Sequence, residues 1–332
     1  MKIDFCKEEN ISDVMLFIDK YWSKNHILSI SKELMYYQHY DEINNRYNYI
    51  VGYDDNHNIE GILGFIPTNK YSLDTNSSIW LSLWKTIPNS SHQLGLQLLS
   101  FLEKSINHNL IGTIGISDEA NQIYKFLKYK VGIMKQFYIV NPNIDVCSIC
   151  SNPIIEIINS DNESKITELD EQTLKTIDIK HSYIPYKNID YIVKKYVKHP
   201  MYHYKLLYIH RLNLLIVARE ITINQVSILR IVDCMGSLDN LYATPKFLLN
   251  YIIDNNYEYV DLLSYGLDVG LLEQGGFSSV NIDNTKIIIP MYFEPFLKEN
   301  KIVRFAYKSK LDNIVLFKAD ADQDRPNIIR EI

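Results

Sequence analysis

The sequence contains two similar helix–strand units about 150 residues apart. Residues 98–101 (Leu-Leu-Ser-Phe), in a helical pattern, precede the strand-like segment 109–112, and residues 248–251 (Leu-Leu-Asn-Tyr) precede segment 259–262 in the same way. Each unit ends with a short predicted helix. The dipeptide Lys128-Tyr129 closes the helix of the first unit, and Gly276-Phe277 closes that of the second. An internal repeat of this length predicts two copies of one arrangement, each the size of an ordinary domain. A chance similarity of helix–strand patterns is the alternative.

The repeat divides the 332 residues into expected domains 1–145 and 146–332, joined near 141–163, where Asn, Pro, Ser and Asp cluster. Apolar periodicity and turn residues predict the elements of the first copy. They are helices at 10–22 and 31–40, strands at 47–53, 60–66 and 78–85, a helix at 96–105, a strand at 110–116, a helix at 119–127 and a strand at 131–140. After the second copy we expect closing strands at 286–290, 303–307 and 313–318, and a polar tail at 320–332.

Charge and apolar content exclude several classes of protein. Lys and Arg number 34 and Asp and Glu 40, a net charge of −6, which argues against a duplex nucleic-acid binder. No segment approaches the run of about 18–20 apolar residues that a membrane helix needs, and the N-terminus lacks a signal-peptide pattern. Four cysteines are too few for a disulfide framework. We therefore expect a cytoplasmic protein whose partners include neither nucleic acid nor membrane.

The sequence does not favour metal or redox chemistry. Cys147 and Cys150 form a CxxC pair, but 48 residues separate it from the HxxxH pair of His199 and His203, whereas a finger-type zinc site needs about 12–15. Turn-forming Asn-Pro pairs flank the CxxC, where a redox motif would open a helix after a strand. The GxSxG, HExxH, GxxxxGK[ST] and GxGxxG signatures are also missing. We therefore expect no metal, and the class of catalysis stays open.

The loop at residues 90–97 connects the strand at 78–85 to the helix at 96–105. A strand that enters a helix through small polar residues leaves unpaired amides at the helix start, and these suit a phosphate or pyrophosphate. Gly95 lets a ligand approach the backbone closely, and His92 can add a donor. An ordinary helix entry with a surface histidine would look the same.

The motif His92-x-x-Gly95-x-Gln97 resembles the Gln/Arg-x-x-Gly-x-Gly/Ala loop of the GNAT superfamily of N-acetyltransferases. Residues 117–129 resemble the later family element that carries an Asn and a Tyr, and residues 271–277 are similar to it without those two side chains. The resemblance implies an α/β chain of two GNAT-like domains, each a mixed, mostly antiparallel central sheet flanked by helices. It assigns coenzyme A contacts in the first domain to Gln93, Leu94, Gly95, Leu96, Gln97 and Asn121. His92, Gln97 and Lys128-Tyr129 depart from the family pattern.

Residues 22–28, 61–67 and 290–296 resemble two-domain acyltransferases of the anthrose-pathway type. This resemblance implies transfer of an acyl group from acyl-CoA to the amine of a dTDP- or UDP-linked amino sugar, by direct attack of the amine on the thioester. The pathway would be surface-polysaccharide biosynthesis, such as that of O-antigen, and an oligomer is compatible with it. The second domain would bind the acceptor and have a structural role.

Such a reaction needs a neutral amine, a polarised carbonyl and a proton for the departing thiolate. Imidazole is the side chain that serves most often as a general base near neutral pH, and His92 is our candidate for taking the amine proton. Ser82, on the strand beside the loop, is the candidate donor to the sulfur or the oxyanion. Tyr124 occupies the place of the family's general acid. Backbone hydrogen bonding of Ser82 and core packing of Tyr124 are the structural alternatives.

Acceptor binding is expected at Trp22, His26 and Asp118. Trp22 and His26 are four residues apart and share a face if the first helix continues. The second half lacks a matching glycine loop and is acidic at residues 233–240, so we expect one coenzyme site, in the first half. Two alternatives remain: an aminoacyl or peptidyl transferase that uses charged tRNA, against which the net charge counts, and a non-catalytic scaffold whose coenzyme loops have degenerated.

Overall fold

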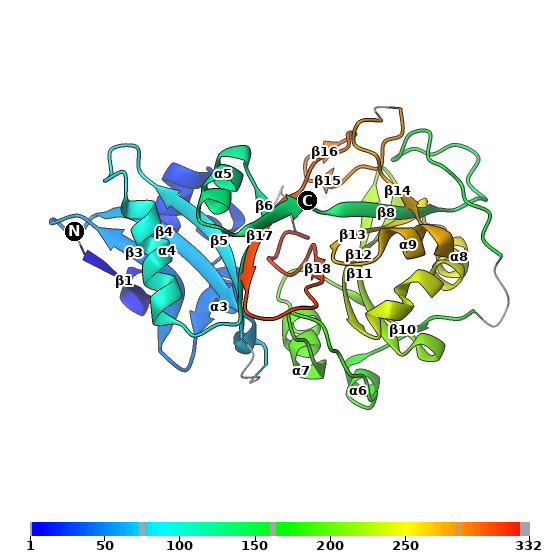
Figure 1. Ribbon diagram of the computed structural model, residues 1–332, viewed down its shortest axis with the longest axis horizontal. Coiled ribbons are helices and arrows are strands. Elements are labelled where there is room, and N and C mark those ends of the chain that lie inside the picture. The colour runs from blue at the N-terminus through cyan, green and yellow to red at the C-terminus, as the bar shows by residue number, and fades with distance from the viewer. Residues whose placement is uncertain (1, 73–76, 160–163, 285, 326–332) are drawn as a thin grey trace.

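The computed structural model describes residues 2–72, 77–159, 164–284 and 286–325. Two eight-stranded sheets lie beside each other, one in each half of the view in Figure 1. The first sheet has the order β1-β3-β4-β5-β6-β17-β7, and β2 pairs with β3. Its strands are β1 (Lys2–Lys7), β2 (Tyr40–Asp41), β3 (Arg46–Tyr53), β4 (Ile59–Pro67), β5 (Ser78–Thr86), β6 (Leu110–Ile116), β7 (Lys130–Ile133) and β17 (Arg304–Ser309).

The second sheet has the order β14-β8-β13-β12-β11-β10-β9, and β18 pairs with β13. Its strands are β8 (Lys135–Val140), β9 (Thr167–Glu168), β10 (Lys205–Ile209), β11 (Leu214–Ile223), β12 (Val226–Gly236), β13 (Tyr259–Tyr265), β14 (Ser278–Ser279) and β18 (Leu316–Phe317). A small hairpin joins β15 (Tyr292–Phe293) to β16 (Phe296–Leu297). Each large sheet contains one parallel pair, β5–β6 or β12–β13, among antiparallel neighbours. The expected mixed, mostly antiparallel sheets are confirmed.

The same order of elements recurs around the two parallel pairs. Helix α4 (Leu94–Ser105) connects β5 to β6, and α8 (Pro245–Asp254) connects β12 to β13. Helix α5 (Asp118–Phe126) follows β6 as α9 (Val269–Gly275) follows β13. The other α-helices are α1 (Ile11–Phe17), α2 (Ile27–Ile30), α3 (Lys32–His39), α6 (Glu171–Leu174) and α7 (Ile189–Ile192). Among the described residues, no helix is long and apolar enough to span a bilayer.

The order of the strands along the chain does not separate the two sheets, because strand β17, late in the chain, belongs to the first sheet and strand β8 to the second. Residues 131–140, expected to form one strand, divide at Met134 into β7 of the first sheet and β8 of the second, seen as the long green segment between the halves in Figure 1. Strand β17, from late in the chain, inserts between β6 and β7. A single buried cluster contains residues of both halves, including Trp80, Ile114, Val217 and Val232. The division at residues 145 and 146 stays a prediction, and part of the expected joint, 160–163, lies outside the described residues.

The first predicted helix is less regular than its pattern suggests. Residues 8–10 form a 3₁₀ turn, α1 follows, and residues 18–22 form a π-helical turn. The helix ends at Trp22, because Ser23 has extended backbone angles and Asn25 has a φ of 58°. The next helices have side-chain caps, with Ser31 accepting the Leu34 amide at 3.1 Å to start α3.

Candidate active site

A wedge-shaped gap opens between the parallel strands β5 and β6. The two strands pair at Ser78–Leu110, Ile79–Ile111 and Trp80–Gly112, and no further pair follows along these described strands. Beyond that point β5 stays with β4 as far as Thr86, and β6 stays with β17 as far as Ile116. A cavity of about 440 Å³, here called the wedge cavity, lies at this gap. Its lining comprises residues 81–85 of β5, residues 113–117, and Trp22, His26, Ile27, Leu28, Leu34, Gln38, Ala120, Tyr124, Tyr202, Ala321, Asp322, Gln323 and Arg325.

Ser82 stands at an irregularity in β5 where the gap begins. Leu63 of β4 is opposite Trp84 and Phe65 is opposite Leu81, so Ser82 and Leu83 together face Gly64. This is a β-bulge, which turns backbone groups out of the regular ladder and re-aims the side chains. Ser82 is half-buried and lines the wedge cavity. The bulge therefore places Ser82 at the cavity.

Tyr124 reaches the same cavity from α5. Ser117 caps this helix by accepting the Ala120 amide at 3.2 Å, and Ser117, Ala120 and Tyr124 share the helix face that lines the cavity. The Tyr124 ring is 2% exposed, with its centroid 5.6 Å from that of Trp84 and 5.0 Å from that of Tyr129. Burial, with a further contribution from Glu103, raises the pKa of Tyr124 well above its usual value. Its phenol therefore stays protonated at neutral pH.

Trp22 and His26 both line the wedge cavity, although the helix that would join them ends at Trp22. His26 caps α2: its Nδ1 accepts the Leu28 amide at 3.2 Å. A neutral imidazole that accepts at Nδ1 carries its proton on Nε2. Burial lowers the pKa of His26 to about 4, so the ring is neutral near pH 7. His26 is therefore a hydrogen-bond donor at neutral pH rather than a base.

The predicted coenzyme loop lies at the start of α4, outside the lining of the wedge cavity. The Leu94 amide bonds to the Ser91 carbonyl at 2.9 Å, and no side chain caps the helix. Within the described part of the chain, the Gly95 and Leu96 amides donate to no protein acceptor. A Cβ on residue 95 would lie 3.3 Å from Trp84 Nε1, so the absent side chain lets Trp84 pack on α4. Trp84 in turn lines the cavity, and so connects the helix start to it.

Three other predicted residues do not reach the wedge cavity. His92 is exposed in the turn before α4. Asp118 pairs with Arg304 at 2.8 Å and has a largely exposed carboxylate, while Asn121 is half-buried on α5. Around one cavity the fold thus gathers Ser82, Tyr124, Trp22 and His26, and the roles of all these residues stay predictions.

A buried wall of the cavity comes from residues 320–325, which the sequence pattern assigned to a polar tail; residues 326–332 lie outside the described chain. That expectation is wrong for Asp320, Ala321 and Asp324, which are 1–5% exposed. Gly115 of β6 has a φ of 81°, and a Cβ there would lie 2.6 Å from Gln323 Oε1, so this segment packs directly against the gap.

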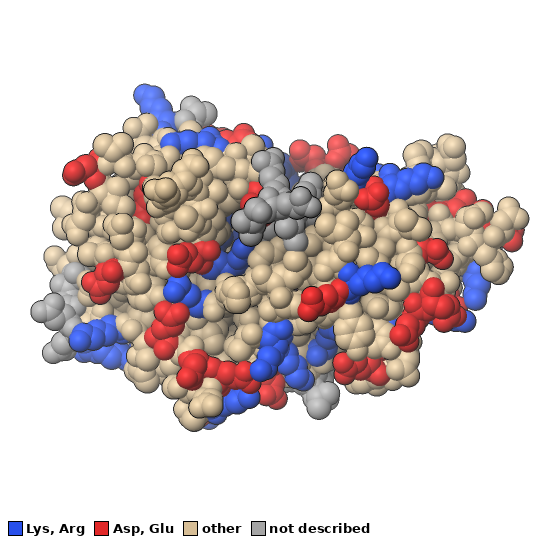
Figure 2. Space-filling model, turned by 180° about the vertical axis from the view of Figure 1, so that it is seen from behind, with Lys and Arg blue, Asp and Glu red and all other residues tan. Residues whose placement is uncertain are grey.

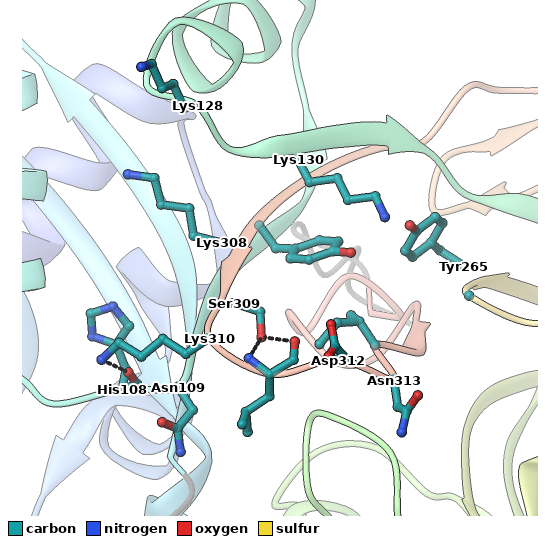
Figure 3. Close-up of a pocket in the computed structure, with 14 residues that line it drawn as sticks. His108, Asn109, Lys128, Lys130, Tyr265, Lys308, Ser309, Lys310, Asp312 and Asn313 are labelled. Atoms are coloured by element: carbon teal, nitrogen blue, oxygen red, sulfur yellow. Dashed lines mark hydrogen bonds between the residues drawn. The ribbon is translucent and has the colours of Figure 1, made fainter.

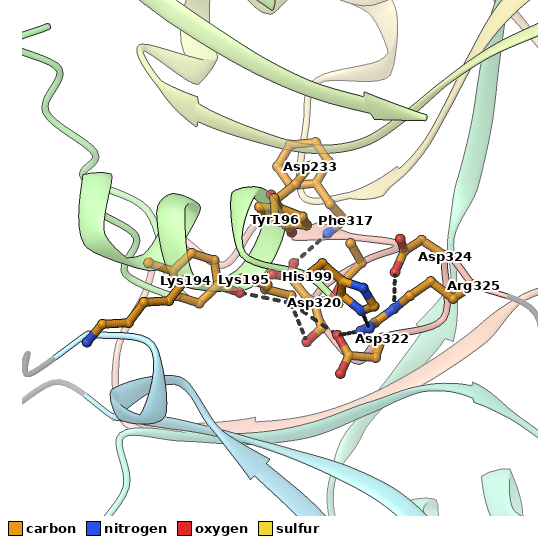
Figure 4. Close-up of polar contacts among 12 residues, drawn as sticks. Lys194, Lys195, Tyr196, His199, Asp233, Phe317, Asp320, Asp322, Asp324 and Arg325 are labelled. Carbon is orange, nitrogen blue, oxygen red and sulfur yellow. Dashed lines mark hydrogen bonds and ion pairs between the residues drawn. The ribbon is translucent and has the colours of Figure 1, made fainter. Parts of the chain in front are cut away.

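A buried network of charged and polar groups holds this segment (Figure 4). Lys187 pairs with Asp233 and, at 2.8 Å, with Asp320, and Tyr196 donates to Asp233 at 2.5 Å. Further contacts continue the network to the cavity: Lys195 to the Ala319 carbonyl at 2.6 Å, Tyr204 to Asp324 at 2.8 Å, and Arg325 to Asp322. Burial alone would lower the pKa of Lys187, but the two carboxylates hold it above its usual value. Pairing of this kind offsets the cost of removing charged groups from water, so charged residues can form an interior wall of the cavity.

The corresponding gap in the second sheet is filled by the chain itself. Strands β12 and β13 pair only from Leu229–Val260 to Ile231–Leu262. Beyond that, β18 pairs with the end of β13, and the Ala319 amide bonds to the Val232 carbonyl of β12 at 3.1 Å. A ligand could enter here only by displacing this segment.

The two cysteines of the CxxC pair lie beside Glu258. Ligand atoms of Cys147, Cys150 and Glu258 lie within 4.8 Å of one another. The Glu258 carboxylate accepts the amides of Ser148, Ile149 and Cys150 at 2.6–3.1 Å. These bonds give the carboxylate a structural role as the anchor of the loop.

No protein-family model matches the sequence, and no curated protein matches it. Solved structures do match. The chain is similar to a GCN5-related N-acetyltransferase from Anabaena variabilis ATCC 29413, with a TM-score of 0.54 and 12% identity over 93% of this chain and 72% of that one. It is also similar to a protein from Enterococcus faecalis V583 described as a probable N-acyltransferase, with a TM-score of 0.51 and 8% identity over the same shares. At this identity the likeness shows the fold, which is that of the GCN5-related N-acetyltransferases.

Proposed function

We propose that the protein is an acyl-CoA-dependent N-acyltransferase that modifies the amine of a nucleotide-linked amino sugar and reacts at the wedge cavity. The observation that carries this proposal is the gap between β5 and β6, which has a buried, protonated Tyr124 on one side and the free amides of α4 beside it. The fold shared with N-acetyltransferases supports acyl transfer in general. The resemblance of three segments to sugar acyltransferases supports the acceptor class.

Acyl-CoA fits the groups present here and would supply the thioester. The Gly95 and Leu96 amides, together with the positive end of the α4 dipole, would hold its pyrophosphate. Trp84 connects this end of α4 to the wedge cavity, where the acyl end would lie. No residue in this arrangement requires a metal ion.

Three side chains of the cavity would assist attack by the amine. Ser82, on the bulge of β5, would donate to the oxygen on which negative charge develops. Tyr124 would return a proton to the departing thiolate, because its raised pKa keeps the phenol protonated until a stronger base appears. His26 would orient the acceptor through Nε2–H.

The proton of the incoming ammonium has two candidate acceptors. His92 is our first candidate, from an exposed turn outside the cavity. Asp322 lines the cavity, and its side chain is 6% exposed, but it is already paired with Arg325 and, at 3.5 Å, with Lys195. Two cations thus already engage this carboxylate. The exposed position of His92 would suit deprotonation of the amine before it enters the cavity.

The alternative of transfer from charged tRNA receives less support. On the face shown in Figure 2, the described Lys and Arg side chains are interspersed with Asp and Glu. A tRNA-binding surface would favour a continuous basic tract. The alternative of a non-catalytic scaffold differs from the enzyme proposals in its affinity for coenzyme, because a degenerate loop would not bind coenzyme.

A thermal-shift titration with coenzyme A, acetyl-CoA, dTDP and UDP, each alone, tests the proposal. We expect stabilisation by the coenzyme and by one nucleotide, followed by thiol release when amino sugars linked to that nucleotide are added. If no coenzyme stabilises the folded protein, the scaffold alternative gains support. Coenzyme binding without nucleotide binding would preserve acyl transfer and remove the sugar-nucleotide acceptor.

A further inference from the structure

A second cavity, of about 780 Å³, lies at the end of the first sheet opposite to the wedge cavity (Figure 3). Its walls include His108 and Asn109, which directly precede β6, whereas the wedge cavity adjoins the last residues of that strand. A strand of this length separates its two ends by about 20 Å. Among the residues that the structure describes, none lines both cavities. The second cavity is therefore separate from the proposed acyl-transfer site.

Four lysines line this second cavity, and we call it the basic cavity. Lys128 follows α5, Lys130 begins β7, and Lys308 and Lys310 stand at the end of β17. Among the described residues, three of them form no ion pair with a carboxylate, while Lys308 Nζ lies 3.6 Å from Glu103. Asp312 is the one carboxylate among the described residues that line the cavity. A protein with a net charge of −6 thus concentrates positive charge in one concavity.

The ammonium group of Lys130 lies beside a pair of aromatic rings. Its Nζ is 5.4 Å from the ring centroid of Tyr265 and 5.8 Å from that of Tyr307. Figure 3 shows the Lys130 side chain directed towards Tyr265. Hydrogen bonds to the two phenols raise the pKa of Lys130, so the amine stays charged. Lys130 is therefore positively charged, and its contacts with Tyr265 and Tyr307 fix the direction of its side chain.

We propose that the basic cavity binds an oligophosphate, a ligand with at least two linked phosphate groups. Four lysines around one concavity, three of them without a carboxylate partner among the described residues, favour a ligand with several negative charges. Lysine ammonium groups are compact point charges that suit phosphate oxygens. A ligand with only one carboxylate would neutralise only one of these lysines. The volume lies in the range of small-molecule sites. Free pyrophosphate and the diphosphate of a nucleotide share this chemistry.

Both halves of the chain would contact the ligand. Lys128, Lys130 and Lys308 belong to the first sheet and its loops, and Tyr265 ends β13 of the second. A ligand that binds across this junction stabilises the folded state as a whole. Binding should therefore raise the thermal midpoint as well as release heat.

Isothermal titration calorimetry at about 150 mM salt, with pyrophosphate, orthophosphate, UDP and uridine as separate probes, tests the proposal. We expect saturable binding of pyrophosphate, at least tenfold tighter than that of orthophosphate. Tighter binding of UDP than of pyrophosphate would support a nucleotide as the source, and equal binding would support the free anion. Uridine that binds as tightly as UDP would overturn the proposal.

The variants Lys130→Glu and Lys128→Glu locate the binding. Each should weaken pyrophosphate binding at least tenfold, while Lys180→Glu, at an exposed lysine outside the basic cavity, should change it less than twofold. Lys128 is exposed in a turn, so its variant remains informative if Lys130→Glu fails to fold. Absence of saturable binding, or equal weakening by Lys180→Glu, would overturn the proposal. So would binding that only a Gly95→Leu change removes, since that would place the anion at α4.

Discussion

The Nδ1 atom of His26 accepts the backbone amide of Leu28 at 3.2 Å, and this bond fixes which nitrogen faces a ligand. Protonation of the ring would break the bond and place a charge in a buried site. His26 thus cannot gain a proton without a loss of local structure, which fits a pKa lowered to about 4.

We predict that the protein loses stability as the pH falls from about 7 to 4. Burial lowers the pKa values of His26 and His181 to about 4, and those of His39 and His199 to about 3. The unfolded chain takes up these protons near pH 6.5 and the folded chain only near pH 3–4, so stability is full above pH 6.5 and falls as protons favour unfolding. Each histidine contributes up to about 3 kcal/mol. Urea titrations at several pH values measure the slope, and His26→Gln should reduce it.

Replacement of Tyr124 by Phe should lower the turnover number about 100-fold or more, because general acid catalysis contributes a factor of that order. Coenzyme affinity should change little. Tyr129→Phe is the matched control: its ring neighbours Tyr124, but its hydroxyl donates to Glu103 at 2.7 Å and lies outside the cavity lining. Equal losses in the two variants would show that packing is the cause.

The variants His92→Ala and Asp322→Asn distinguish the two candidate acceptors of the amine proton. We expect His92→Ala to reduce turnover about 100-fold with coenzyme binding largely intact. A full rate in this variant, together with a slow Asp322→Asn enzyme of normal thermal stability, would transfer the role to Asp322. The stability measurement matters because Asp322 also pairs with Arg325.

Gly95→Leu should weaken coenzyme A binding at least tenfold. A side chain at this position collides with Trp84 and obstructs the first turn of α4, where we place the pyrophosphate. Leu96→Gln, at a neighbouring exposed position, keeps the backbone amide and should bind normally. Unchanged affinity of the Gly95→Leu variant, measured by calorimetry, would remove the loop from the coenzyme site.

Lys187→Met should destabilise the fold by about 3–5 kcal/mol, because it leaves Asp233 and Asp320 buried without their cation. Denaturant unfolding measures the change, and Lys175→Met provides the control. Lys175 forms an exposed pair with Glu171, whose loss should cost less than about 1 kcal/mol. A similar small effect at Lys187 would mean that solvent reaches the network.

Local pattern predicted most of the first sheet and the helices that follow its strands. Periodicity identifies β5, α4 and β6 because their residues pack against near neighbours. Ser82 was selected from its place on the strand beside the loop, and Tyr124 from the resemblance to the N-acetyltransferase superfamily; both residues line the wedge cavity. The position of β17 could not be found in this way, because its partners β6 and β7 are far away in sequence.

The wall formed by Asp322 and Gln323 was missed for a different reason. Polar residues late in a chain look solvent-exposed unless their buried partners are known, and here the partners include Lys195 and Arg325. A partial signal was present in the sequence, since Asp320 and Asp322 alternate with Ala319 and Ala321 directly after the apolar run 314–317.

The insertion of β17 has a consequence for biosynthesis. Strands β6 and β7 leave the ribosome about 170 residues before the strand that joins them. At ordinary translation rates that interval lasts roughly 10–30 s. Throughout it, the nascent first half has two unpaired strand edges and an incomplete wedge cavity. The wedge cavity is therefore complete only after residue 325 has left the ribosome, and until then the two strand edges are open to pairing with other chains.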